Sequence, residues 1–172
     1  ASGANLFNLI NVNGTLYFTA DDGVNGRELW KSDGAEAGTM MVKDIHSGAS
    51  NASPFSLINV NGTLYFTAFD GVHGFELWKS DGTEAGTMMV KDIRSGATSS
   101  YPSELTNVNG MLYFAADDGV NGRELWKSDG TEAGTMMVKD IHSGASNANL
   151  YNLINVNGTL YFRARDGVHG YE

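Results

Sequence analysis

The sequence of 172 residues predicts an all-β fold, a β-propeller built from four-stranded antiparallel blades. One observation is a repeat of constant length: the segment NVNGTLYF recurs every 48 residues, starting at Asn11, Asn59, Asn107 (with Met in place of Thr) and Asn155. A second is that β-branched and aromatic runs alternate with turn dipeptides inside each unit, whereas helical periodicity is absent. Units of about 40–50 residues that cannot bury their own apolar side chains are typical of propeller blades.

Four short strands are expected in the first unit. The first is an apolar run that ends at Asn13-Gly14, a dipeptide that supplies the positive φ angles of a tight hairpin turn. The second is rich in β-branched and aromatic residues and leads into a loop with two further turn dipeptides. Asp33-Gly34 separates the third strand from the fourth, and a longer crossing leads to the next unit. These signals place the strands at residues 6–12, 15–20, 27–32 and 39–45.

Both faces of each expected sheet carry apolar side chains. Along the second strand Leu16 and Phe18 point to one face and Tyr17 to the other. Blades stacked radially cover both faces, whereas a two-sheet sandwich, the alternative architecture, leaves one face of each sheet in water. The expected blades span residues of about 5–52, 53–100 and 101–148, and a partial blade of two strands spans about 149–172.

Composition excludes several classes of function. The chain has 20 Asp and Glu against 11 Lys and Arg, a formal net charge of -9, and no Cys. The acidic balance argues against nucleic-acid partners, and no apolar run approaches the ~20 residues that a membrane-spanning helix needs. A disulfide and a Cys-ligated zinc are excluded. Because the sequence starts at Ala1 and ends at Glu172 within a repeat, a processed, trimmed or excised chain is expected.

A second motif carries a family resemblance. The segment ELWKSDG, followed by TEAGT or AEAGT and then MVKDI, begins at Glu28, Glu76 and Glu124. With NVNGTLYF upstream, it resembles the ELWxxDGT repeat family of bacterial proteins over essentially the whole chain. The resemblance implies a β-propeller in large exported or cell-surface proteins, hence a secreted or surface location, with no reaction or catalytic residue attached to the repeat.

Three repeats and a hairpin are fewer than the roughly 4–8 blades of closed propellers. An open arc leaves the apolar faces of its first and last blades exposed, and such patches drive association. The sequence therefore predicts either self-association, as a homodimer or higher oligomer, or a segment of a longer array.

The variable residues of the repeat gather in two kinds of connection that are expected on one face of the ring. These are the loop between the second and third strands and the crossing to the next blade. Binding residues are often carried on such loops, whose partner here is expected to be a glycan or a protein, although drift at tolerant surface positions is the competing explanation. The candidate ligand-facing residues are Asn25, Arg27, His46, His73, Phe75, Arg94, Asn121, Arg123, His142, His169 and Tyr171.

No cofactor is expected, with calcium as a weak alternative. Asp21, Asp22 and Asn25 place oxygens at alternating positions as a calcium loop does, but Gly23 occupies a ligand position and two copies have His in place of Asn. A ring of histidines is interrupted, because Arg94 stands where the other crossings have His.

Among functions, a non-catalytic scaffold or interaction module is the first expectation, because no asymmetric cluster of activated groups singles out one copy. The chain is therefore predicted not to be an enzyme. One alternative is a multivalent carbohydrate-binding module that uses Arg27, Glu28 and Trp30. The competing expectation is that Trp30 packs in the core between blades and that Glu28 pairs with the backbone or a cation of a neighbouring blade. Another alternative is an engineered or reconstructed propeller, which the uniform repeats favour.

The Met pairs, such as Met40-Met41, are expected to fill the core.

Overall fold

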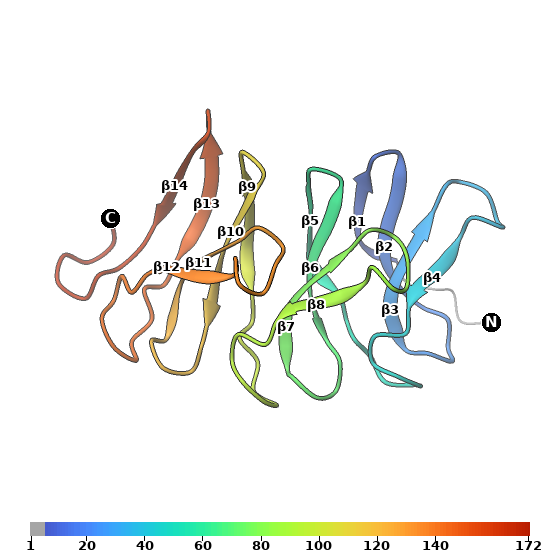
Figure 1. The fold of residues 1–172 in the computed structure, drawn as a ribbon, viewed down its shortest axis with the longest axis horizontal. Coiled ribbons are helices and arrows are strands. Elements are labelled where there is room, and N and C mark those ends of the chain that lie inside the picture. The colour runs from blue at the N-terminus through green and yellow to red at the C-terminus, as the bar shows by residue number, and fades with distance from the viewer. Residues whose placement is uncertain (1–5) are drawn as a thin grey trace.

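Residues 6–172, which the computed structural model describes, form fourteen β-strands arranged in four sheets (Figure 1). Three sheets have four antiparallel strands in sequence order, and the fourth is a two-stranded hairpin. We refer to these sheets as blades 1 to 4. The described part of the chain contains no helix, and therefore none that is long and apolar enough to cross a membrane. The predicted fold class is confirmed.

The strand bounds repeat from blade to blade. Blade 1 contains β1 (Phe7–Val12), β2 (Thr15–Asp21), β3 (Arg27–Ser32) and β4 (Met40–Lys43). Blade 2 contains β5 (Phe55–Val60), β6 (Thr63–Phe69), β7 (Phe75–Ser80) and β8 (Met88–Lys91). Blade 3 contains β9 (Ser103–Val108), β10 (Met111–Asp117), β11 (Arg123–Ser128) and β12 (Met136–Lys139). The hairpin of blade 4 contains β13 (Tyr151–Val156) and β14 (Thr159–Arg163).

The turn between β1 and β2 forms as the sequence predicts. Asn13 and Gly14 have φ angles of 52° and 87°, which match a two-residue hairpin turn, and the Asn11 side chain accepts a hydrogen bond of 3.1 Å from the Gly14 N–H. A bulge between Phe7 and Ile10 interrupts the pairing of β1 with β2, with Asn8 at φ 55°. The bulge bends the start of the strand, as such insertions do.

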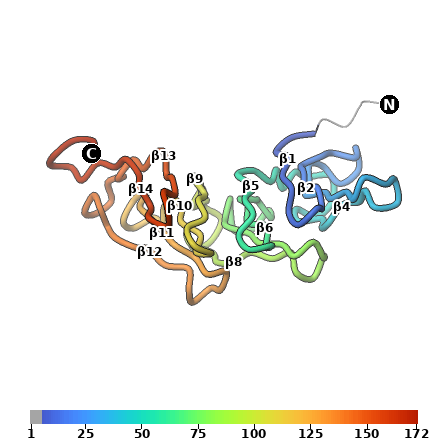
Figure 2. Tube along the Cα trace, turned by 90° about the horizontal axis from the view of Figure 1, so that it is seen from above, coloured from blue at the N-terminus to red at the C-terminus, as the bar shows by residue number. Residues whose placement is uncertain are grey.

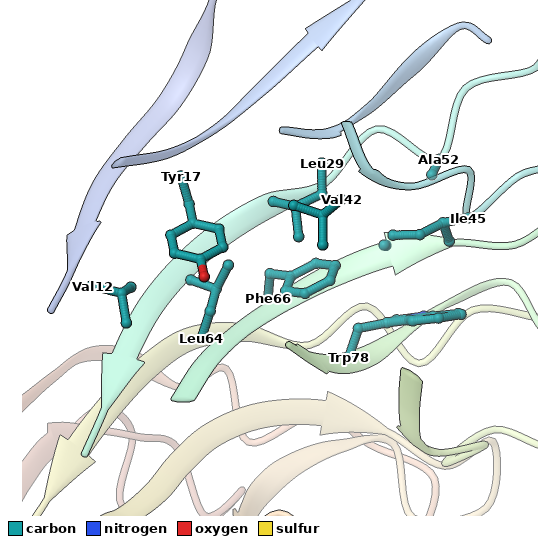
Figure 3. Close-up of a cluster of buried hydrophobic side chains, with 10 residues drawn as sticks. Val12, Tyr17, Leu29, Val42, Ile45, Ala52, Leu64, Phe66 and Trp78 are labelled. Carbon is teal, nitrogen blue, oxygen red and sulfur yellow. The ribbon is translucent and has the colours of Figure 1, made fainter. Parts of the chain in front are cut away.

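Blades pack face to face through apolar side chains (Figure 3). Tyr17, Leu29 and Val42 from blade 1 meet Leu64, Phe66 and Trp78 from blade 2 in one buried cluster. The opposite face of blade 2 contributes to a second cluster, which it shares with blade 3. A sheet covered on both faces by neighbouring sheets excludes the two-layer sandwich.

The first strands of successive blades are neighbours, in the order β1, β5, β9 and β13. The blades consequently stand in a row along the molecule (Figure 2). The loops between second and third strands share one side of this row with the crossings, since the Arg27 N–H donates a 2.7 Å hydrogen bond to the Asn51 side chain in the first crossing. We call this side the loop face. The direction of the strands predicts that these loops and the crossings lie on the same side, and the structure agrees.

Some strand bounds and the burial of some side chains differ from those that the sequence predicts. The fourth strand, expected at 39–45, is limited to Met40–Lys43 because Ile45 turns its N–H toward a buried glutamate described below. Met40, expected in the core, is 44% exposed, as are Met88 and Met136, while Met89 and Met137 pack against the core. The expected start of blade 1 near residue 5, and the start of the chain at Ala1, lie outside the described residues.

Trp78→Ala is expected to lower the free energy of unfolding by about 3–5 kcal/mol, because it opens a cavity between blades 1 and 2. Chemical denaturation followed by circular dichroism measures the loss. Trp30→Ala is the matched control, since Trp30 has the same place in blade 1 but is only half-buried, and its loss should be smaller. Equal losses for the two variants would contradict an inter-blade role for Trp78.

Candidate functional site

A buried glutamate lies at the start of the third strand in each complete blade. The carboxylate of Glu28 accepts hydrogen bonds from the backbone N–H groups of Ile45 (2.9 Å), His46 (3.3 Å) and Ala52 (3.1 Å), all in the crossing from blade 1 to blade 2. Glu28 is 0% exposed. A backbone partner is confirmed, but the donors belong to the crossing at the end of the glutamate's own repeat and not, as the sequence predicts, to the neighbouring blade.

The other two copies repeat this arrangement. Glu76 accepts from the N–H groups of Ile93 (3.0 Å) and Ser100 (2.9 Å) and from the Ser100 hydroxyl (2.6 Å). Glu124 accepts from Ile141 (2.8 Å), His142 (3.4 Å) and Ala148 (3.1 Å). Each glutamate thus fixes one crossing, which makes it a structural residue and removes it from a sugar-binding set.

Burial controls the protonation of these carboxyl groups. It raises the pKa of Glu28 and of Glu76 to about 7, even though the N–H donors favour the ionised form. Repulsion from Asp44 and Asp92, respectively, raises the two pKa values further. The pKa of Glu124 is raised as well, again mainly by burial.

The first residues of the crossings contact the next blade. The ring of His46 meets Phe69 edge to face at a centroid distance of 4.9 Å. At the same place one blade further, the Arg94 guanidinium forms a 2.7 Å ion pair with Asp117. The His142 Nδ1 donates a 3.0 Å hydrogen bond to the Asn147 carbonyl oxygen. These candidate residues therefore contribute to contacts within and between blades.

The candidate residues at the start of the third strands also lie against neighbouring groups. The Arg27 guanidinium lies 4.8 Å over the ring of Phe7, and Tyr171 has Arg163 4.2 Å over its ring. Arg123 donates hydrogen bonds to the carbonyl oxygens of Tyr101 (2.7 Å) and Ala115 (3.1 Å). Phe75, at the equivalent position of blade 2, stacks on Tyr101.

The candidate residues in the loops between second and third strands bind carboxylates of their own loops. Asn25 and Asn121 each donate a 2.7 Å hydrogen bond to the Asp three residues earlier, and His73 and His169 contact Asp70 and Asp166 at 2.7 Å. The hydrogen bond to Asp70 raises the pKa of His73, and that to Asp166 raises the pKa of His169.

The loop that the sequence suggests as a weak calcium site is the one between the second and third strands of blade 1. The carboxylates of Asp21 and Asp22 accept hydrogen bonds from the N–H groups of Gly23 (2.7 Å), Val24 (2.9 Å) and Asn25 (2.8 Å). Within residues 6–172, no three His, Asp or Glu side chains converge as metal ligands would. The contacts of Asp21 and Asp22 are those of a self-bonded hairpin loop.

Sequence reasoning missed an aromatic group on the loop face. Phe55, Phe69 and Tyr101 were not among the candidates, yet they surround Phe75 with ring centroids 5.4–5.6 Å from its own. The available signal was the comparison of copies: Tyr101 stands where the preceding crossing has Ser53 and the following one has Asn149.

Comparison with known proteins gives one structural match. No family model and no curated protein matches the sequence, so the ELWxxDGT resemblance stays a prediction. An α-L-arabinofuranosidase from Clostridium thermocellum is similar in structure with a TM-score of 0.40 and 18% sequence identity. The match covers 95% of this chain and 61% of that chain.

The prediction that the chain is not an enzyme is contradicted by this match, because the neighbour is an enzyme. The prediction rested on the equivalence of the copies. The structure shows that they are not equivalent, since the boundary of blades 2 and 3 carries an aromatic group and the Arg94–Asp117 ion pair. A match at a TM-score of 0.40 and 18% identity assigns no reaction to this chain.

The raised pKa values predict pH-dependent stability. Between the ordinary pKa of 4.5 and the folded value of about 7, Glu76 binds a proton on folding. This protonation stabilises the fold fully below pH 4.5, and the contribution is lost as pH rises through about 7. Glu76→Gln removes the titration, so its unfolding free energy should vary less than that of the wild type between about pH 5 and about pH 8.

Urea unfolding at a series of pH values measures the two slopes. Glu76 also helps to raise the pKa of His73, so the comparison is repeated in a His73→Asn background, where only the other histidines remain and are shared by both proteins. Glu84→Gln, at an exposed turn, serves as the control and should keep the wild-type slope. An unchanged slope in Glu76→Gln would show that the buried carboxyl group does not titrate in this range.

Proposed function

We propose that the chain is a β-propeller interaction module that associates with a second copy of itself through its two end faces. The end faces are the outer face of blade 1 and the outer face of the hairpin in blade 4. The observation that carries the proposal is a change in burial along the repeat. Tyr17 and Tyr65 are 6% and 5% exposed where another blade follows, whereas the equivalent Tyr161 is 57% exposed.

Other residues of the blade 4 face follow the same rule. Val12, Val60 and Val108 are 4–6% exposed, but Val156 is 45% exposed. Ile154 on the same hairpin is 55% exposed. These apolar side chains occupy positions that are buried by a following blade elsewhere in the chain, so a further blade of this repeat fits them.

Blade 1 offers the complementary surface. Leu6, Phe18, Ala20 and Trp30 line an apolar hollow on its outer face. The equivalent residues of blade 2, including Phe66, Ala68 and Trp78, fill the cluster between blades 1 and 2. The hollow therefore matches the side of a blade that receives its predecessor.

Two glycine positions indicate how the faces fit. A Cβ at Gly62 would overlap the Asn13 side chain of the preceding blade, and a Cβ at Gly82 would overlap the Tyr17 hydroxyl. The equivalent positions in blade 1, Gly14 and Gly34, have no atom within 4 Å of such a Cβ. Head-to-tail docking would bring Asn157 and Tyr161 of one copy to Gly14 and Gly34 of the other.

The contact joins two different surfaces, the blade 4 face of one copy and the blade 1 face of another. Two copies related by a twofold axis can make this contact twice and close a ring, whereas copies that do not close form an open chain. The same surface would accept a further blade of the same repeat in a longer array. The family resemblance supports an exported or cell-surface setting for such an assembly.

Light scattering tests the proposal. The wild type is expected at twice the 18.4 kDa of one chain or more, with a mass that depends on concentration. Tyr161→Asp places a charge in the apolar contact and should give the mass of a single chain.

Val168→Asp is the control, because Val168 is 81% exposed and its equivalents Val72 and Val120 stay 62% and 70% exposed in blades that have neighbours on both sides, so it should leave the mass unchanged. A wild type with the mass of one chain at every concentration would refute self-association. Equal effects of the two substitutions would show that the contact lies elsewhere.

A further inference from the structure

Four aromatic rings form a connected group where the loop face crosses from blade 2 to blade 3. Phe75 lies at the centre, with its ring centroid 5.6 Å from that of Phe55, 5.4 Å from that of Phe69 and 5.5 Å from that of Tyr101. The planes of Phe75 and Tyr101 are only 23° apart, so these two rings are stacked. The group as a whole gives Tyr101 a rigid apolar support.

Tyr101 is held in place and yet exposed. Its N–H donates a 3.1 Å hydrogen bond to the Phe75 carbonyl oxygen, and its own carbonyl oxygen accepts a 2.7 Å bond from Arg123. The side chain is nevertheless 54% exposed. An aromatic ring that is supported from behind and open in front presents a flat apolar surface at little cost in conformational entropy.

Polar groups border this surface. The Asp117 N–H donates a 3.0 Å hydrogen bond to the carbonyl oxygen of Ser100, the residue directly before Tyr101. The Asp117 carboxylate forms the ion pair with Arg94, and the two side chains remain 28% and 33% exposed. They also line a shallow polar hollow together with Asn147. The polar hollow thus adjoins the backbone directly before Tyr101, and its donors and acceptors are held in fixed geometry by the ion pair.

The arrangement occurs once among residues 6–172. The position of Tyr101 is occupied by Ser53 in the preceding crossing and by Asn149 in the following one. The position of Phe75 is occupied by Arg27 and Arg123 in the neighbouring blades. Packing of the crossing does not require the tyrosine, since Ser53 has the same backbone conformation, with φ 47° against 48° for Tyr101.

We infer that Tyr101, stacked on Phe75, forms a binding site for a saccharide, to which the Arg94–Asp117 pair of the adjoining polar hollow contributes hydrogen bonds. A sugar ring has an apolar face that stacks on an aromatic ring. Its hydroxyl groups both donate and accept hydrogen bonds, so they can accept from Arg94 and donate to Asp117. The site is an open surface, which suits a segment of an oligosaccharide better than an enclosed apolar cofactor. The net charge of -9 disfavours polyanionic ligands. The site is separate from the end faces and does not depend on self-association.

The test uses the full chain and soluble oligosaccharides of glucose, xylose, mannose and galactose as probes. Amide NMR titration up to about 10 mM should detect at least one probe with a Kd of about 1 mM, with shifts centred on Tyr101 and Asp117. Tyr101→Ser should weaken that binding about tenfold or more, because it removes the stacking surface. Tyr101→Asn, with the residue of the next crossing, provides a second variant that the repeat tolerates.

Tyr151→Ser is the matched control, because Tyr151 is another exposed tyrosine of the loop face and Ser103 naturally occupies its position in blade 3. It should leave the affinity unchanged. The titrations are repeated on Tyr161→Asp, so that a failure of saccharide binding is distinguished from a failure of self-association. No binding by any probe, or equal affinity in Tyr101→Ser and wild type, would overturn the inference. So would a loss of affinity in Tyr151→Ser that equals the loss in Tyr101→Ser.

Discussion

The buried glutamate at the start of each third strand is the interaction on which the arrangement of blades depends. The crossing between blades turns several backbone N–H groups toward the protein interior, and each would be costly to bury without a partner. In the first crossing Glu28 accepts from three of these groups. The same crossing then donates and accepts backbone bonds on both sides, from Ser53 to Arg27 and from Phe69 to Ala52. One side chain thereby sets the position of the next blade.

Lysines supply a second connection between blades. The ammonium group of Lys31 donates a 2.7 Å hydrogen bond to the Gly82 carbonyl oxygen, and that of Lys43 donates a 2.8 Å bond to the Thr87 carbonyl oxygen. Both acceptors lie in the turn between the third and fourth strands of the following blade. Lys79 and Lys91 repeat these contacts from blade 2 to blade 3, so the uniform ELWKSDG and MVKD segments are explained by contacts between successive four-stranded blades. Uniformity of these segments is a packing requirement and carries no information about a ligand.

The sequence predicted the strands and hairpin turns because their determinants are local. Asn13-Gly14 specifies its turn without help from other blades, and the expected third strand agrees with β3 at both ends. The role of Glu28 was predicted for a related reason, since a charged residue beside Leu29 in an apolar strand requires a partner. The aromatic group was missed because Phe75 and Tyr101 meet only after the crossing folds back over blade 2. Met40 lies on β4, the edge strand of blade 1, and is 44% exposed there.

The differences among copies on the loop face divide into two kinds. Where His46 becomes Arg94, its partner changes from Phe69 to Asp117, so each crossing residue suits the loop of the blade that follows it. Variation of this kind is explained by packing between blades and needs no ligand. Tyr101 is different, because the backbone around it is satisfied equally by Ser53 in the preceding crossing and more than half of its surface faces solvent. Tyr101 is therefore the part of the loop-face variation that packing between blades leaves unexplained, and it is the residue on which the proposed saccharide site rests.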